Sequence, residues 1–284
     1  YLQHNLVVTN LLMNNYSNID DKIILCGNSR FDLLKKPIKN VYLEAAKNIN
    51  KKYGKFDLYI SAFHKYNALT QPGTNYLTDI KSWGDNLIEH EKRKKLFSNM
   101  FELQKKNMMS TINFFNLNSK KMNKMIIRPH PAENLSTWTN NLNEDLKENV
   151  IYDHINTNSW IMAADRVFGY YCTSTIEASL LGKMAVNLIF NKGEVFKTKI
   201  FDLFCNEINN PINYEDLDLK IKNLEIKFSK DFVNDKASFF FKNYNSYNAE
   251  LVCDEITKFI KDKKKQNVKD RFDNKIYFAF FLIL

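Results

Sequence analysis

Residues 166–190, RVFGYYCTSTIEASLLGKMAVNLIF, indicate the fold class most clearly. Its first four residues form a short apolar run that predicts a strand over 166–169, and residues 183–190 predict a second strand. Between them, residues 173–181 are typical of a short helix that ends before Gly182, a common residue just after a helix. Strand, helix and strand in this order form the unit from which parallel α/β sheets are built.

The same alternation continues on both sides of this unit. Short apolar runs predict further strands over 22–26, 56–60, 125–127 and 149–152. Longer amphipathic stretches predict helices over 86–115, 132–147, 158–164 and 214–260. Five or six strands with helices between them predict an α/β fold, a Rossmann-like, doubly wound parallel sheet.

Composition excludes several classes of protein. A chain of 284 residues that is 44% hydrophobic can bury a core, which excludes wholesale disorder. Only 7 Gly and 5 Pro exclude collagen-like and linker-like chains. The four cysteines are far apart and form no CxxC motif, so we expect no zinc site and a reducing compartment. The net charge of +9 invites a nucleic-acid partner, but no aromatic and basic motif of an RNA- or DNA-binding module is present, so we expect none.

A polar segment, RPHPAE over residues 128–133, follows directly after the strand expected over 125–127. Its two prolines fix the backbone on both sides of His130, so a stiff loop presents the imidazole. Arg128 beside His130 suits an anionic ligand, as a phosphate clamp or a proton donor. The alternative is a polar turn that only ends the strand, with Arg128 paired to Glu133.

A second polar segment, YYCTSTIEA over residues 170–178, lies where a strand ends and a helix begins. A helix start offers backbone N–H groups and the positive end of the helix dipole, and Ser or Thr hydroxyls extend such an anion site. Glu177 lies one turn into the helix and suits the hydroxyls of a ribose. The alternative is a capping box from Ser174 to Glu177, which needs no ligand.

His64 follows the strand expected over 56–60 and could line the same edge of the sheet, although surface loops also hold single histidines. The chain has no Walker loop and no GxGxxG, HExxH or GxSxG motif. This argues against P-loop NTPases, the common NAD-dependent dehydrogenases, zincins and α/β-hydrolases.

Several segments, taken in order, resemble the bacterial surface carbohydrate biosynthesis proteins, which are of GT-B glycosyltransferase type. The His-Pro motif is also similar to that of capsule Kdo transferases, polysialyltransferases and the glycerophosphate transferases of teichoic acid synthesis. The resemblance covers roughly residues 20–190. The segments are GNSRFDLL at 27–34, Tyr42 and Glu44, Tyr53 and Gly54, RPHPAE at 128–133, Trp160, AAD at 163–165, CTSTIEA at 172–178 and LGK at 181–183.

The resemblance implies two Rossmann-like domains, of which this chain would be the C-terminal, donor-binding half. It implies that His130 contacts the donor phosphate or assists the leaving group, with Arg128 in support. It further implies a donor-binding set made of His64, Glu133, Thr173, Ser174, Thr175 and Glu177. In this set Ser174 and Thr175 would hold phosphates and Glu177 the ribose, and neither a metal nor a cofactor is expected.

We therefore expect a bacterial glycosyltransferase of surface polysaccharide synthesis, such as capsule or lipopolysaccharide. It would transfer a sugar from a nucleotide sugar to a glycan or a lipid-linked acceptor. The alternatives are a nucleotide-sugar epimerase or glycerophosphate transferase of the same fold, and a nucleotide-sugar-binding module without catalysis. The products formed from a given donor would distinguish the enzymes from one another. The effect of replacing His130 on the glycan would distinguish them from the binding module.

The chain begins with Tyr1, which suggests that it starts inside a longer transferase. We expect a remnant of an upstream domain over 1–30, a nucleotide-sugar-binding domain over 31–260 and a tail over 261–284. Residues 258–275 carry eight Lys or Arg and three Asp, and apolar residues 277–284 follow. Such a segment suits loose attachment of a cytoplasmic protein to the anionic inner face of the membrane, and a solvated helix end is the alternative.

Overall fold

The computed structural model describes residues 2–3, 24–25, 29–35, 38–69, 87–193 and 205–225, and the single residues 254, 257, 258 and 261. These residues belong to two units, one made of residues 1–41 with 229–284 and the other of residues 42–228. The expected domain limits after residues 30 and 260 stay predictions. The apolar segment 277–284 and most of the basic segment before it lie outside the described residues.

The first unit contains a short parallel pair of strands, β1 (Leu2–Gln3) and β2 (Ile24–Leu25). Helix α2 (Ser29–Asp32) follows, and the 3-10 helix η2 (Ile38–Tyr42) leads into the second unit. Of the strand expected over 22–26, Ile24 and Leu25 are confirmed, and the other three residues lie outside the described residues.

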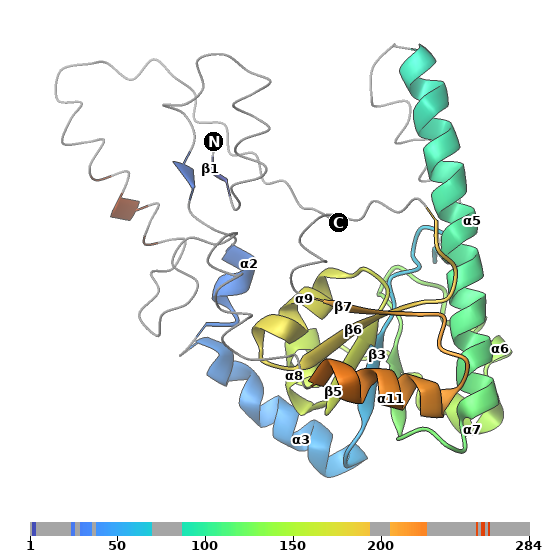
Figure 1. The fold of residues 1–284 in the computed structure, drawn as a ribbon. Coiled ribbons are helices and arrows are strands. Elements are labelled where there is room, and N and C mark those ends of the chain that lie inside the picture. The colour runs from blue at the N-terminus through green and yellow to red at the C-terminus, as the bar shows by residue number, and fades with distance from the viewer. Residues whose placement is uncertain are drawn as a thin grey trace, which may run out of the picture. The chain divides into compact units, whose positions relative to one another are not determined.

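The second unit is built on a five-stranded sheet with the order β4-β3-β5-β6-β7, and every neighbouring pair is parallel (Figure 1). The strands are β3 (Asp57–Ile60), β4 (Met125–Arg128), β5 (Arg166–Gly169), β6 (Met184–Ile189) and β7 (Asn206–Asn209). Parallel neighbours require crossover connections, and helices supply them.

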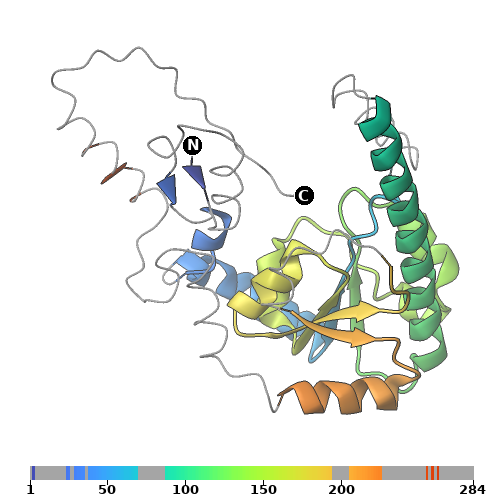
Figure 2. The same cartoon turned by 45° about the horizontal axis from the view of Figure 1, so that its top comes forward.

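The helices cover both faces of this sheet (Figures 1 and 2). They are α3 (Leu43–Tyr53), α5 (Leu87–Asn118), α6 (Leu135–Asn141), α7 (Glu144–Lys147), α8 (Thr157–Ala163), α9 (Thr173–Leu180) and α11 (Tyr214–Glu225). Helices α3, α8 and α9 pack on one face, and α5, α6, α7 and α11 pack on the other. The prediction of a doubly wound parallel sheet is confirmed.

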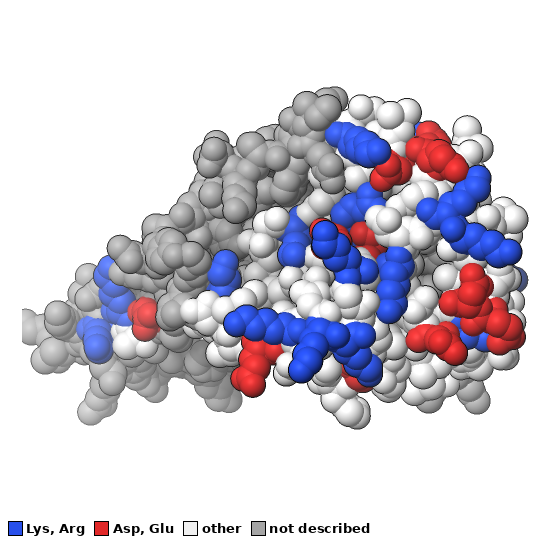
Figure 3. All heavy atoms as spheres, turned by 90° about the horizontal axis from the view of Figure 1, so that it is seen from below, with Lys and Arg blue, Asp and Glu red and all other residues white. Residues whose placement is uncertain are grey.

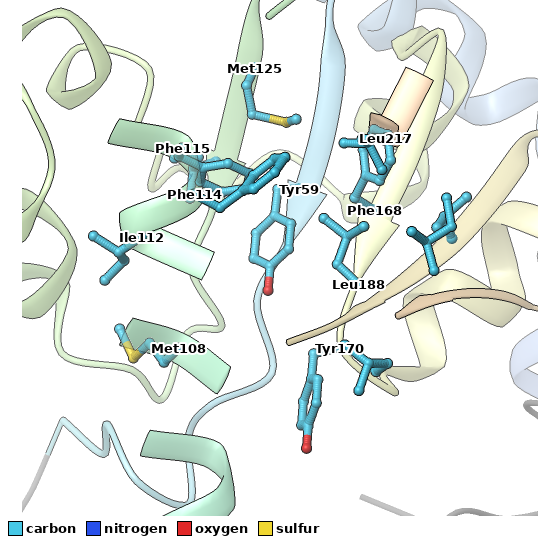
Figure 4. Packing of buried hydrophobic residues seen from close by; sticks show 14 of the residues in the cluster. Tyr59, Met108, Ile112, Phe114, Phe115, Met125, Phe168, Tyr170, Leu188 and Leu217 are labelled. Carbon is cyan, nitrogen blue, oxygen red and sulfur yellow. The ribbon is translucent and has the colours of Figure 1, made fainter. Parts of the chain in front are cut away.

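Alternation along the strands explains why both faces are apolar, because successive side chains of a strand point to opposite faces. In β3, Leu58 belongs to the cluster under α3 and α8, whereas Tyr59 belongs to the cluster under α5. The ring of Tyr59 meets Phe115 of α5 edge to face, with centroids 5.2 Å apart. Figure 4 shows Tyr59 near Phe115 and Met125, with Phe168 on the neighbouring strand.

The prediction of a single helix over 132–147 is wrong in two respects. The helix begins later, because the side chain of Asn134 accepts a hydrogen bond from the Ser136 N–H and caps α6. It is also interrupted, because Leu142 is extended and Asn143 is held by Asn116 of α5: the Asn143 N–H donates to the Asn116 side-chain oxygen, and the Asn143 side-chain amide donates to the Asn116 carbonyl. Two short helices, α6 and α7, result.

The strand expected over 149–152 is also wrong, since the chain makes only an isolated parallel bridge there, between Val150 and Ile127. The chain then turns, because the carboxylate of Asp153 accepts from the Ile155 N–H and from Arg128. Strand β7 was missed because only one of its residues, Ile208, is buried, which leaves no apolar run to find.

Close packing between β5 and β3 depends on Gly169. A Cβ atom at this position would lie 2.7 Å from Thr175 Cγ2, 3.1 Å from Cys172 Sγ and 3.2 Å from the Ile60 carbonyl oxygen. Real contacts of a Cβ atom are longer, so only glycine lets the start of α9 lie this close to the end of β3.

An ion-pair network fixes α11 to the opposite, amino ends of the strands. Arg166, the first residue of β5, donates to both carboxylate oxygens of Asp57 at 2.9 and 2.6 Å, and to Asp218 and the Tyr214 hydroxyl of α11 at 3.1 Å each. Burial disfavours the guanidinium charge, but the hydrogen bonds and charge of Asp57, together with the bonds to Tyr214 and Asp218, outweigh burial and raise the pKa of Arg166. Arg166 thus ties two strands and a helix together.

Other charged side chains of α11 pair at the surface. Lys121 contacts Glu215 at 2.9 Å, and within α11 Lys220 contacts Asp216 at 2.7 Å. On the face in Figure 3, Lys and Arg side chains are interspersed with Asp and Glu. In the part of the chain that the structure describes, no helix is both long and apolar enough to cross a bilayer.

Replacing Gly169 with alanine is expected to lower the free energy of unfolding by about 1–3 kcal/mol, the usual cost of overpacking. The added methyl group collides first with Thr175 Cγ2. Thr175→Ser removes that atom. Gly169→Ala should therefore lower the free energy of unfolding less in the Thr175→Ser background than in the wild type. Urea denaturation of the four proteins measures this, and equal losses in both backgrounds would contradict the predicted collision.

Replacing Arg166 with methionine is expected to destabilise the chain by about 3–5 kcal/mol, because it leaves the buried Asp57 carboxylate without its partner. Lys121→Met is the matched control, because the Lys121–Glu215 pair is solvent-exposed on both sides and should cost less than about 1 kcal/mol. Chemical denaturation compares the two, and similar losses would argue that the buried network contributes no more than a surface pair.

Candidate functional site

The polar segments found in the sequence meet at the carboxyl ends of β3, β4 and β5. Strand β3 lies in the middle, with β4 on one side and β5 on the other, so the order of strands reverses between β3 and β5. In open α/β sheets, ligands bind outside the carboxyl ends of the strands near such a reversal. The register places Ile60 beside both Arg128 and Gly169, so all three loops leave the sheet at one level.

Two histidines come together there from different loops. His64 follows β3 and His130 follows β4, and their ring centroids are 4.8 Å apart with the planes inclined by 33°. Both side chains are half-buried. The sequence placed each of them after a strand, and the strand order makes them neighbours.

The orientation of His130 determines where its proton lies. Its Nδ1 accepts a hydrogen bond from the Ala132 N–H at 3.1 Å, so Nδ1 carries no hydrogen in this arrangement. A neutral His130 therefore has its proton on Nε2, which is available as a donor. Burial lowers the pKa of His130, which favours this neutral form.

His64 is more strongly biased towards its neutral form. Burial, then the nearby His130 and then Lys65, lowers the pKa of His64 to about 4. Its Nδ1 atom is buried and has no hydrogen-bond partner among the described residues. A buried ring nitrogen without a partner is uncommon in folded proteins, and it marks this ring as a group with unused hydrogen-bonding capacity.

Glu133 joins the loops after β3 and β4 from inside the protein. Its carboxylate accepts hydrogen bonds from the Ser61 hydroxyl and the Phe63 N–H, both at 2.7 Å, and from Trp138 Nε1 at 2.9 Å. The residue is 1% exposed. Its oxygens are therefore used by the protein, and in this structure Glu133 positions the loops; direct contact with a donor stays a prediction.

A residue that the sequence analysis missed, Gln104 of α5, holds the other side of the His64 loop. Its side-chain oxygen accepts from the N–H groups of Lys65 and Tyr66 at 3.1 and 3.2 Å. The backbone on both sides of His64 is thus fixed, by Glu133 at Phe63 and by Gln104 at Lys65. No local pattern could have revealed Gln104, since it is one polar residue among many on a long helix.

Arg128 is paired with Asp153 at 3.0 Å, so the alternative that Arg128 pairs with Glu133 is wrong. The nitrogen that contacts Asp153, Nη2, also donates to the carbonyls of Asp153 and Ile155. The guanidinium lies over the ring of Trp160. Burial lowers the pKa of Arg128, and Asp153 opposes this effect. The other terminal nitrogen, Nη1, is buried without a hydrogen-bond partner among the described residues.

Helix α9 begins at Thr173 and its N-cap residue is Cys172, which makes no side-chain cap hydrogen bond. The capping box that would start at Ser174 is therefore wrong, because Ser174 lies inside the helix. Thr173 and Ser174 are half-buried at the helix start, whereas Thr175 is buried and donates to the Cys172 carbonyl at 2.7 Å. Glu177 is 2% exposed, so its contact with a ribose stays a prediction.

Of the residues predicted for the site, the structure brings His64, His130 and the start of α9 to one edge of the sheet. Arg128 lies at the end of β4, the edge strand beside β3, and is largely committed to Asp153. Among the described residues, no group of three or more His, Cys, Asp or Glu side chains could hold a metal ion.

Comparison with known proteins shows a relationship of fold. No protein-family model matches the chain, and no curated protein matches its sequence. Solved structures of the wall teichoic acid polymerase TagF are similar at 13% identity: the protein itself (TM-score 0.51, covering 94% of this chain), a His-to-Asn variant soaked with CDPG (0.50, 93%) and a His-to-Ala variant (0.50, 93%). The chain thus shares the GT-B-type α/β fold of these structures and spans 58% of their length.

The stability of the chain is expected to depend on pH through Glu133. Burial raises the pKa of this carboxyl above its ordinary 4.5, and the hydrogen bonds from Ser61, Trp138 and Phe63 offset only part of the effect. A raised pKa in the folded state gives stability that is complete below the unfolded pKa and is lost as the pH rises through the folded pKa.

The difference in free energy of unfolding between the wild type and Glu133→Gln should therefore shrink as the pH rises from about 4 to 7. Glu102→Gln is the control for the loss of a carboxyl, since Glu102 is exposed on α5. Denaturation at a series of pH values measures both, and a growing difference for Glu133→Gln would reverse the predicted direction.

Proposed function

We propose that this chain binds a nucleotide-activated sugar at the carboxyl edge of its sheet and transfers the sugar to a glycan or lipid-linked acceptor. The setting would be the synthesis of a bacterial surface polysaccharide. The observation that carries the proposal is the meeting of His64, His130 and the start of α9 around the reversal in strand order. All of these groups suit the phosphates of such a donor.

The phosphate would be held by donors of different kinds. Neutral His130 offers an N–H at Nε2, because its Nδ1 already accepts from Ala132. The start of α9 contributes the positive end of its dipole and the half-buried hydroxyls of Thr173 and Ser174. Each of these groups stabilises negative charge.

The same groups would assist transfer. When the bond between the sugar and the phosphate oxygen breaks, negative charge develops on the phosphate that leaves. Donors fixed in advance around that oxygen stabilise the transition state more than the ground state, which lowers the barrier. The rigid backbone around His130, set by Pro129 and Pro131, keeps its donor in place. The proposal includes neither a metal nor a cofactor.

Fold similarity supports the proposal at the level of the protein class. TagF is named as a wall teichoic acid polymerase, and one of its structures was soaked with CDPG. The name teichoic acid polymerase, with the His-Pro motif at 129–131, favours a second candidate for this chain, the transfer of a glycerophosphate group, which would use the same phosphate-binding edge. The two candidates differ in product, since one forms a glycosidic bond and the other a phosphodiester.

The proposed location is cytoplasmic, with loose contact between the basic residues 258–275 and the inner face of the membrane. The support comes from sequence: eight positive and three negative residues followed by an apolar stretch. No nucleic-acid partner is proposed.

A thermal-shift screen of CMP-, CDP-, UDP-, GDP- and dTDP-sugars and CDP-glycerol tests donor binding. One class of nucleotide is expected to raise the melting temperature, and His130→Ala or Ser174→Ala should reduce that shift by at least half. His154→Ala is the matched control, since His154 is exposed. A ligand shift that both site variants leave unchanged would refute the assignment of the site.

The donor found in this way is then incubated with candidate acceptors, with and without EDTA. An extended glycan, an epimer, a phosphodiester or no product separates the transferase, epimerase, glycerophosphate transferase and binding-module alternatives. Transfer that persists in EDTA is expected. Complete loss on chelation, restored by Mg²⁺, would show that the metal-free mechanism is wrong.

A further inference from the structure

The two histidines of the candidate site differ in what each can do with a proton. We infer that His64 takes up a proton from solvent when a phosphate or sulfate dianion binds beside the two rings, while His130 stays neutral and donates from Nε2. The inference deepens the proposed function and rests on the phosphate site described above. It assigns separate roles to two residues that the sequence could only place at one edge.

The loops that carry the two rings are held in place. Hydrogen bonds to Glu133 and Gln104 fix the backbone on both sides of His64. On the other side, His130 lies between two prolines, and its carbonyl accepts from the Glu133 N–H at 2.8 Å. Rings held with centroids 4.8 Å apart titrate as a coupled pair, because the charge on one disfavours a charge on the other.

Within the described residues, the protein itself provides no free negative charge for the pair. On the β4 side, the Glu133 carboxylate holds three protein donors and Asp153 is paired with Arg128. On the β3 side, the nearby charge is Lys65, which acts against an imidazolium.

Of the remaining neighbours at this edge, Gln104, Tyr170 and Cys172 are neutral, and the buried carboxyl of Glu177 on α9 acts on Cys172. Gln104 of α5 carries no charge. At the end of β5, burial raises the pKa of Tyr170 to about 12 and that of Cys172 to about 11, so both are protonated near neutral pH. The charges that act on His64 are those of His130 and Lys65, both unfavourable to an imidazolium, so a bound anion beside the rings would supply the stabilising charge.

The hydrogen bonds of the two rings decide which ring takes the proton. Protonating His130 at Nδ1 would place two N–H groups against each other, because Nδ1 now accepts from Ala132. His64 faces no such conflict, since its Nδ1 has no partner among the described residues. The proton therefore goes from solvent to His64. When the bond between the sugar and the phosphate oxygen breaks, this proton can pass from His64 to the departing phosphate oxygen, which returns His64 to its neutral form.

The experiment is an NMR titration of the histidine rings in the full chain, in sulfate and in chloride at equal ionic strength. Sulfate is a suitable probe because it stays a dianion over this pH range, so any proton taken up goes to the protein. The pKa of His64 is expected to rise by about one unit or more in sulfate, the usual effect of an adjacent opposite charge, and that of His130 by less.

His64→Gln and His130→Gln assign the two signals, and exposed His154 serves as the internal reference. If either variant fails to fold, the wild-type signals can be assigned through bonds. Gln104→Ala releases one side of the His64 loop and should reduce the sulfate response. Lys105→Ala, an exposed neighbour on the same helix, should not change it.

Equal pKa values for His64 in both salts would overturn the inference, and so would a proton that goes to His130 instead. Either result leaves the donor-induced thermal shift, and with it the proposed function, intact. Conversely, a sulfate response at His64 without any thermal shift from a nucleotide donor would support the inference and remove the proposed function.

Discussion

The position of strand β3 between β4 and β5 is the constraint on which the rest of the described sheet and its candidate site depends. The chain leaves β3 to form β4 on one side and later returns to place β5 on the other. The loops after β3 and β5 therefore diverge, and backbone groups are exposed where they separate. Gly169 lets β5 and α9 approach β3 as closely as this arrangement requires.

The protein uses its own acidic groups at this edge for internal contacts. Glu133 holds Ser61, Phe63 and Trp138, and Asp153 holds Arg128. What is left facing the edge is a pair of imidazoles and a helix start, both of which favour anions. A buried carboxylate is costly unless its oxygens are hydrogen-bonded, and here that requirement also places the two histidines.

A shared fold at 13% identity with the TagF structures is physically reasonable for a layered protein. Apolar layers tolerate many exchanges of side chains as long as their volume and pattern are kept. One fold can carry many activities, which depend on the residues at the site. The case for donor binding therefore rests on His64, His130 and α9, and on what their geometry does to a phosphate.

The sequence alone determined the parallel α/β class, four of the five strands of the main sheet and the place of each polar segment at a strand end. Apolar runs bounded by Gly, Pro and polar residues are local signals, so they can be found without a partner. It did not predict β7, whose residues are mostly polar because it lies at an edge, or the break between α6 and α7, which Asn116 of α5 imposes. Tertiary contacts bring His64 to His130, pair Arg128 with Asp153, and place Glu133 and Gln104 against the His64 loop. Those contacts join residues 25–70 positions apart, and strand order, which no local pattern encodes, brings them together.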